Sequence, residues 1–346
     1  MINKTLIGLA TIAVVSAAAS GAAHARDRIQ VVGSSTVFPY SQAVAEEFGN
    51  KSGKPAPVVE STGTGGGMKI FCQGLGPDHP DVTGASRAMK KSEWEACQKS
   101  GVTDITEAMI GYDGLSVAHS RKGKTLNLTT QQLFLGLAAQ VPDKSGKLVA
   151  NPYKTWKSID ASLPDTKIQV FGPPPTSGTR DAFVELVMEK SCEEYPAYSK
   201  LDKDKKKEAC SRMRQDGLFI EAGENDNLIV QRLDSDPTAI GIFGYSFLYE
   251  NQDKLLAVKI NGVDPSFTTI QDGSYPISRP LYFYVKNAHR KAIPGLEAFL
   301  KEYVSDAAMG ANGYLHERGL VALTDAKRKE MAAGVTGGKK MDAPTK

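Results

Sequence analysis

Short runs of apolar residues alternate with polar ones along the first part of the chain, and the spacing switches between strand and helix periods. Residues 28–33 have the pattern of a strand, and residues 37–49 carry apolar side chains at helical spacing before a glycine ends the run. Residues 56–60 form a second strand-like run, and we expect the next helix to begin at Gly67. This order predicts repeated strand–turn–helix units.

Further strand-like runs continue the pattern. Residues 81–86 end like a third strand, and residues 108–118 are apolar except for one internal carboxylate, Asp113. Residues 169–172 and 280–285 are two more apolar runs. Strands that alternate with helices predict α/β layers around a mostly parallel sheet, and such sheets bind ligands at the carboxyl ends of their strands.

Three segments rich in glycine and hydroxyl side chains stand where helices are expected to begin. They are residues 33–36, 62–67 and 176–180. The start of a helix exposes unpaired N–H groups and the positive end of the helix dipole. Serine and threonine add O–H donors, while glycine lets the backbone approach an anion closely. Ordinary helix capping would explain any one of them alone; the three together predict a shared oxyanion site.

The N-terminal segment has the features of an export signal. An apolar run over residues 6–19 follows Lys4, and Ala23 and Ala25 fit the small-x-small pattern of a cleavage site. We therefore expect a signal peptide over residues 1–25, removed after Ala25. The alternative, a retained membrane anchor, needs a longer apolar run.

Charge and cysteine content narrow the function further. The formal net charge of +3 gives no reason to expect nucleic acid or another large polyanion as a partner. Four cysteines in an exported chain predict the disulfides Cys72–Cys97 and Cys192–Cys210. A four-cysteine zinc site is the alternative, but no C-x-x-C pair occurs and the histidines lack metal-ligand spacing. We expect neither a metal nor a cofactor.

Two lysine-rich segments carry less information. Residues 203–208 could dock a partner, or they form the solvated face of a helix, which is the interpretation that we favour. The segment after Gly334 has no apolar pattern, and we expect it to be frayed.

An ordered set of short motifs resembles a known family. The motifs are residues 33–36, 64–69, 84–87, 176–180, 231–233 and 239–241. In this order and separation they are similar to the periplasmic phosphate-binding protein of the high-affinity phosphate ABC importer, and the likeness spans nearly the whole mature chain. It implies a hinged, two-domain Venus-flytrap α/β fold with mixed sheets flanked by helices. It also implies a periplasmic monomer without enzymatic activity that holds inorganic phosphate between its domains and delivers it to an inner-membrane permease and ATPase.

The resemblance assigns phosphate ligands to each of the three hydroxyl-rich segments. In the family, the first loop gives phosphate a hydroxyl and a backbone N–H, and the second and third loops add further hydroxyl and N–H donors. The positions of this chain that match them are Ser35, Thr36, Thr64, Ser177, Gly178 and Thr179.

Two positions depart from the best-known members of the family. Arg87 stands where those members have an aspartate that accepts the proton of hydrogen phosphate, and Pro173 stands where they have an arginine. We therefore expect Arg87 and Arg180 to supply guanidinium groups, with ordinary ion pairing as their alternative role. Our first choice for the group that accepts the proton of hydrogen phosphate is Asp113. Asp181 is the second choice, although it also suits a helix cap.

The two apolar crossing segments predict how the chain divides. We expect it to pass between domains near residues 113–117 and again near 275–281. Domain one then holds residues 26–114 and 277–346, and domain two holds residues 115–276.

Two other functions remain open at this point. One is a binding protein for a different tetrahedral oxyanion, such as sulfate or a phosphonate. The other is an exported phosphatase, for which the sequence offers no Asp/His cluster suited to two metals and no serine with an obvious base.

Overall fold

The computed structural model describes residues 26, 28–175, 177–223 and 226–345, so the predicted signal peptide and Thr176 lie outside the described residues. Nine strands of the described chain form one sheet, in the order β2-β1-β3-β13-β4-β10-β8-β9, with β11 paired to β4. Their bounds are β1 (Gln30–Gly33), β2 (Val58–Ser61), β3 (Val82–Ala85), β4 (Ile105–Ser120), β8 (Val170–Gly172), β9 (Phe219–Glu221), β10 (Ile240–Gly244), β11 (Leu255–Ala257) and β13 (Ser278–Lys286).

The sheet is mixed. Its two ends are parallel, because β1 pairs in parallel with β2 and β3, and β8 pairs in parallel with β9 and β10. Its centre is antiparallel, because β13 and β4 run against each other and against their outer neighbours. This confirms the mixed sheet implied by the family resemblance and corrects the expectation of a mostly parallel one.

Helices flank the sheet, and short two-stranded pairs lie outside it. The helices of the first half are α1 (Phe38–Ser52), α2 (Thr64–Phe71), α3 (Lys91–Lys99), α4 (Thr130–Leu137), α5 (Trp156–Ile159), α6 (Gly178–Phe183), a π-helical turn (Val184–Glu189) and α7 (Lys190–Cys192). They are followed by α8 (Pro196–Ser199), α9 (Lys203–Ser211), α10 (Asp226–Ser235), α11 (Tyr245–Glu250), α12 (Phe267–Gln271), α13 (Leu296–Tyr303), α14 (Asp306–Met309) and α15 (Asp325–Thr336), with 3-10 turns at Asn287–His289 and His316–Arg318. The small pairs join β5 (Asn127–Leu128) to β12 (Lys259–Ile260) and β6 (Gln140–Pro142) to β7 (Leu148–Ala150).

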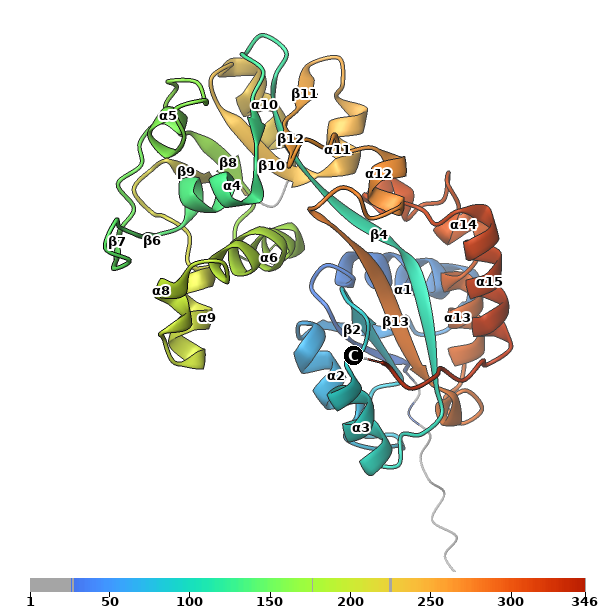
Figure 1. Ribbon diagram of the computed structural model, residues 1–346. Coiled ribbons are helices and arrows are strands. Elements are labelled where there is room, and N and C mark those ends of the chain that lie inside the picture. Colours follow the sequence, from blue (N-terminus) through green and yellow to red (C-terminus); the bar gives the residue numbers. More distant parts are fainter. Residues whose placement is uncertain (1–25, 27, 176, 224–225, 346) are drawn as a thin grey trace, which may run out of the picture.

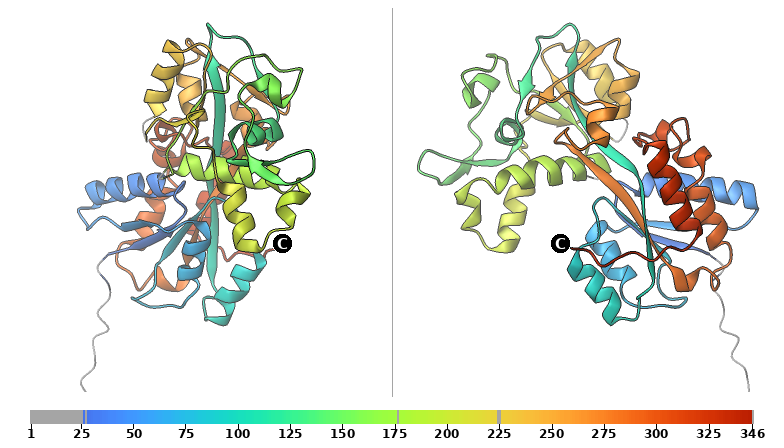
Figure 2. Two further views of the ribbon diagram at one scale, coloured as in Figure 1. Left: turned by 90° about the vertical axis from the view of Figure 1, so that its left-hand side faces the viewer. Right: turned by 45° about the vertical axis from the view of Figure 1, so that its right-hand side comes forward.

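The buried apolar side chains divide into groups that follow the chain. One cluster draws on residues from Leu115 to Ile277, with Val321 added. Two others draw on residues up to Ile110 and from Leu281 onward. We call the elements around the first cluster the middle lobe and those around the other two the terminal lobe. Figures 1 and 2 show the long strands β4 and β13 running side by side from one lobe to the other.

The two predicted disulfides are confirmed. Cys72 at the end of α2 is bonded to Cys97 in α3, with a Cα–Cα distance of 4.2 Å. Cys192 in α7 is bonded to Cys210 in α9, at 5.5 Å. Each bond therefore ties together two neighbouring helices of one lobe.

Two expectations from the sequence need correction. Helix α2 begins at Thr64, three residues before Gly67, so the glycines at 65–67 are helical. The segment after Gly334, which we expected to be frayed, is held in place: the N–H of Met341 donates to the carbonyl of Ile105 at 2.8 Å, and Met341 packs against a cluster of the terminal lobe.

In α9 the lysine-rich segment has mostly exposed side chains, as a solvated helix face would. Nowhere in the described ranges is a helix both long and apolar enough to cross a membrane.

Candidate oxyanion-binding site

The first hydroxyl-rich loop begins at a position that only glycine can occupy. Gly33 has φ +131°, and a Cβ there would lie 2.1 Å from the carbonyl oxygen of Gly84. The close approach joins the ends of β1 and β3, and the N–H of Ser34 donates to the same carbonyl at 2.9 Å. The hydroxyl of Ser34 in turn accepts from the N–H of Thr36 at 3.2 Å, which fixes the turn that leads into α1.

The second loop lies directly beside the first. Thr64 is the first residue of α2, and its hydroxyl lies 2.9 Å from the hydroxyl of Ser86, just past the end of β3. The same Thr64 oxygen accepts from the N–H of Ser86 at 3.1 Å. The N–H of Thr62 donates to the carbonyl of Gly33 at 2.9 Å, so loop two is held against loop one. Ser86 is thus a buried neighbour of the site. It belongs to the motif at 84–87, but sequence analysis did not predict it as a ligand.

The third loop reaches across from the middle lobe. Ser177 caps α6 by accepting from the N–H of Thr179 at 3.2 Å. At Gly178 an added Cβ would lie 2.8 Å from Cα of Thr36 and 2.9 Å from the carbonyl oxygen of Ser35. The glycine therefore allows the backbones of two loops from different lobes to touch.

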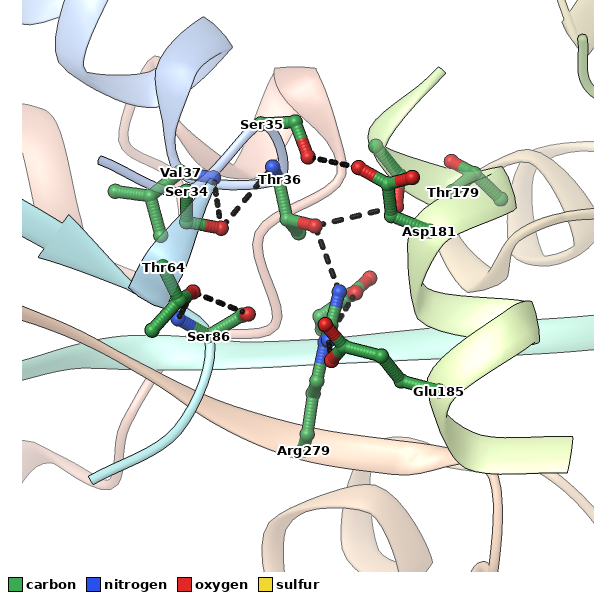
Figure 3. Close-up of polar contacts among 12 residues, drawn as sticks. Ser34, Ser35, Thr36, Val37, Thr64, Ser86, Thr179, Asp181, Glu185 and Arg279 are labelled. Atoms are coloured by element: carbon green, nitrogen blue, oxygen red, sulfur yellow. Dashed lines mark hydrogen bonds and ion pairs between the residues drawn. The ribbon is translucent and has the colours of Figure 1, made fainter. Parts of the chain in front are cut away.

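Hydroxyl groups complete the contact between the lobes. The hydroxyl of Thr36 donates to the carbonyl of Gly178 at 3.2 Å, and the hydroxyl of Ser35 donates to the carboxylate of Asp181. Figure 3 shows these groups facing one another from α6 and the loop before α1. Asp181, our second choice of acceptor, thus already accepts a hydrogen bond from loop one.

Arg279 is the cation at the centre of this arrangement, and sequence reasoning missed it. Its register partner across β13 and β4 is Asp113, whose carboxylate lies 3.3 Å from Nε of Arg279. Nη2 donates to the hydroxyl of Thr36 at 2.7 Å, and Nη1 pairs with the carboxylate of Glu185 (Figure 3). The guanidinium is buried, and it joins both crossing strands to the first loop and to the π-helical turn.

The carboxylate of Asp113 stands in a strongly perturbed environment. Burial raises the pKa of Asp113, the nearby guanidinium of Arg279 works against that rise, and the charge of Glu185 adds to it. A buried charge needs a partner, and Arg279 supplies it. The structure therefore shows Asp113 as the ion-pair partner of Arg279.

The two arginines predicted as ligands have other contacts here. Both Nη atoms of Arg87 reach the carboxylate of Glu93, at 2.9 and 2.7 Å, and this bond raises the pKa of Arg87. Nη1 of Arg180 donates to the carbonyl of Pro173 at 3.0 Å and lies 3.4 Å from Glu221. Burial lowers the pKa of Arg180. Among the described residues of the three loops, it is Thr36 whose hydroxyl contacts a guanidinium, and that guanidinium belongs to Arg279.

A signal for Arg279 was present in the sequence. It directly precedes the apolar run at 280–285, within the second segment predicted to cross between domains. Asp113 interrupts the first crossing segment in the same way. Two opposite charges in two crossing strands suggest a cross-strand pair, but only the register places them opposite each other. Among the described residues, no group of three or more His, Cys, Asp and Glu side chains is arranged to hold a metal.

Comparisons with known proteins agree on the kind of molecule. A family model described as a PBP superfamily domain matches residues 18–307. Protein SphX of Synechococcus elongatus is 33% identical over 282 residues, covering 80% of this chain and 72% of SphX. The phosphate-binding protein PstS of Staphylococcus saprophyticus is 30% identical over 298 residues, covering 84% and 79%.

Solved structures give the same result. A possible phosphate binding protein from Planctomyces limnophilus is 32% identical, with a TM-score of 0.73 and coverage of 91% of this chain and 99% of that one. PstS from Borrelia burgdorferi, at 19% identity and a TM-score of 0.58, shares the fold over 86% of this chain and 100% of its own. The chain therefore belongs to the PBP superfamily, as a relative of the PstS and SphX proteins.

Proposed function

We propose that this protein is an exported, periplasmic binding protein that captures inorganic phosphate between its two lobes and delivers it to an ABC importer. The observation that carries the proposal is the convergence of the three helix-start loops, two from the terminal lobe and one from the middle lobe, next to the guanidinium of Arg279. The names of the relatives support phosphate as the ligand.

The chemistry of these groups suits a small, multiply charged oxyanion. N–H and O–H donors at helix starts can replace the hydration shell of phosphate without adding charge. A guanidinium adds a planar fork of charge-assisted donors. We therefore retain the predicted ligand set and add two members: Ser35, Thr36, Thr64, Arg87, Asp113, Ser177, Gly178, Thr179 and Arg180, together with Ser86 and Arg279.

Selectivity requires an acceptor as well as donors. Phosphate carries a proton near neutral pH and sulfate does not, so a carboxylate that faces the ligand favours phosphate. The unpaired clash with sulfate would cost a few kcal/mol, or roughly a hundredfold in affinity. Asp113 and Asp181 stay the proposed acceptors, and both lie next to loop one or to Arg279.

The proposed domain division gives the binding event a consequence that a transporter can detect. We infer boundaries at 114/115 and 276/277, supported by the way the hydrophobic clusters divide. A ligand held by loops from both sides stabilises the closed arrangement of the lobes. An inner-membrane permease and ATPase complex would then distinguish loaded from empty protein by shape, and the protein would act as a monomer without catalysis.

Calorimetric titration with phosphate and with sulfate tests the function. We expect phosphate to bind with one site per chain and sulfate to bind at least roughly a hundredfold more weakly. Preferred binding of sulfate or a phosphonate would assign a different ligand. Turnover of p-nitrophenyl phosphate, with or without a divalent metal, would favour the phosphatase alternative, and we expect none.

A further inference from the structure

We propose that the carboxylate of Glu185 is an internal competitor for the guanidinium of Arg279, and that phosphate displaces it on binding. The inference rests on the proposed function and identifies a residue that sets the affinity of the same site. Glu185 belongs to the π-helical turn of the middle lobe, whereas Arg279 lies on the crossing strand β13.

The three partners of Arg279 differ in how firmly they are held. Asp113 is its direct cross-strand neighbour, and the Asp113 side chain is only 11% exposed. Thr36 is buried in the loop before α1. The side chain of Glu185 is 49% exposed, so water can solvate its carboxylate as soon as it leaves the guanidinium. Glu185 is therefore the partner that can be exchanged at least cost.

Glu185 also stands where a ligand of the three loops would arrive. It lies four residues after Asp181, on the same side of the helical segment, and Asp181 accepts the hydroxyl of Ser35 from loop one. Figure 3 shows Glu185 beside Arg279, with which its carboxylate is paired. Burial raises the pKa of Asp113, and the charge of Glu185 adds to that rise.

An oxyanion and the carboxylate cannot share this position freely. A guanidinium binds an oxyanion best through two parallel N–H groups. In Arg279, Nη1 and Nη2 can offer such a pair, but Nη1 already donates to Glu185. If Glu185 stayed in place, two negative groups would lie side by side and repel each other. Phosphate binding therefore includes the free energy needed to remove Glu185 from Nη1.

The test is calorimetric titration of phosphate into the Glu185→Gln variant of the mature protein. The amide pairs weakly with the guanidinium and carries no charge, so we expect phosphate to bind about tenfold more tightly than in the parent. The matched control is Glu189→Gln, which makes the same change of charge in the same π-helical turn. Glu189 accepts from the hydroxyl of Ser211 at 3.0 Å, away from Arg279, so its affinity for phosphate should stay within about twofold of the parent.

Each other result has a definite meaning. Unchanged affinity in Glu185→Gln would refute competition while leaving the phosphate function intact. Weaker binding would also refute it, because Glu185 would then support the phosphate-bound form. Equal tightening in both variants would assign the effect to net charge and overturn the specific role. If the parent bound no phosphate, the proposed function would fail, and this inference with it.

Discussion

The guanidinium of Arg279 touches groups from three elements that are far apart in the sequence. It reaches Asp113 on β4, Thr36 in the loop before α1 and Glu185 in the π-helical turn. A lysine could satisfy one of these partners, but its single ammonium group cannot replace a planar fork. The residue therefore combines a structural ion pair with N–H donors that we propose for phosphate.

We expect Arg279→Lys to weaken phosphate binding by about 1.5–3 kcal/mol, roughly 10- to 100-fold, because it removes charge-assisted donors while keeping the charge. Arg279→Ala should in addition destabilise the fold by about 3–5 kcal/mol, because Asp113 would be left buried without its partner. Titration calorimetry and urea unfolding measure the two effects. The control is Arg121→Lys, at an exposed backbone contact with Gln252; parent-like binding by Arg279→Lys would remove Arg279 from the site.

Arg87 has two competing roles that mutation can separate. If it is a phosphate ligand, Arg87→Ala should weaken phosphate binding by about 2–5 kcal/mol, because a charge-assisted donor pair is lost. Glu93→Gln should have a much smaller effect, since it removes only the present partner of Arg87. Calorimetry on both variants decides the matter. Parent-like binding by Arg87→Ala would make Arg87 structural and reject the exchange of charges that we infer within the family.

Lys286 gives the terminal lobe a pH dependence in alkaline solution. It is fully buried, its Nζ donates to the carbonyl of Gly74 at 2.6 Å, and burial lowers its pKa from 10.5 to about 8. Between these values the unfolded chain binds a proton that the folded chain has released, so this residue makes the free energy of unfolding rise with pH.

We expect the Lys286→Met variant to lack that rise. Urea unfolding of parent and variant should be compared between pH 7.5 and about 9.5, below the range in which exposed tyrosines ionise. The difference between their free energies of unfolding should change with pH. A constant difference over this range would mean that Lys286 keeps an ordinary pKa.

At the scale of elements, the predicted strands and helices match the observed ones where apolar spacing is regular. The predicted bounds of β3 and the predicted start of α1 lie within one or two residues of the observed ones. The predicted start of α2 is wrong because three successive glycines have low helix propensity and no apolar period. Tertiary contact overrides that propensity: a Cβ at Gly67 would lie 2.5 Å from Cα of Gly33, so the helix packs directly on loop one.

The contact between loop one and α6 can be tested with a single methyl group. In Gly178→Ala the added Cβ would lie within 3 Å of backbone atoms of Ser35 and Thr36. The loops would have to separate, which we expect to cost about 1–3 kcal/mol of phosphate affinity, roughly 5- to 150-fold. Gly334→Ala in α15, where the new methyl group meets only ordinary contacts, is the control in the same calorimetric titration. Equal binding by both variants would show that these loops do not close on the ligand.

At the scale of the whole molecule, apolar composition predicts the two long strands β4 and β13 but not how they pair. The apolar runs at 108–118 and 280–285 lie within these strands, and the division of the chain into two domains near them stays a prediction. The pairing of Asp113 with Arg279 depends on strand register, and the contact of Thr36 with Gly178 depends on how the lobes meet. Both contacts join residues far apart in the chain, and the spacing of apolar residues does not predict them.

We propose that loops from both lobes bind one phosphate next to Arg279. A crystal structure of the protein grown with saturating phosphate would test this proposal. We expect one phosphate in contact with the hydroxyls of Thr36 and Thr64, the N–H of Thr179 and the guanidinium of Arg279, with Glu185 moved away from Nη1. A structure in which phosphate lies elsewhere, or in which these loops remain in contact with no ion between them, would contradict the account.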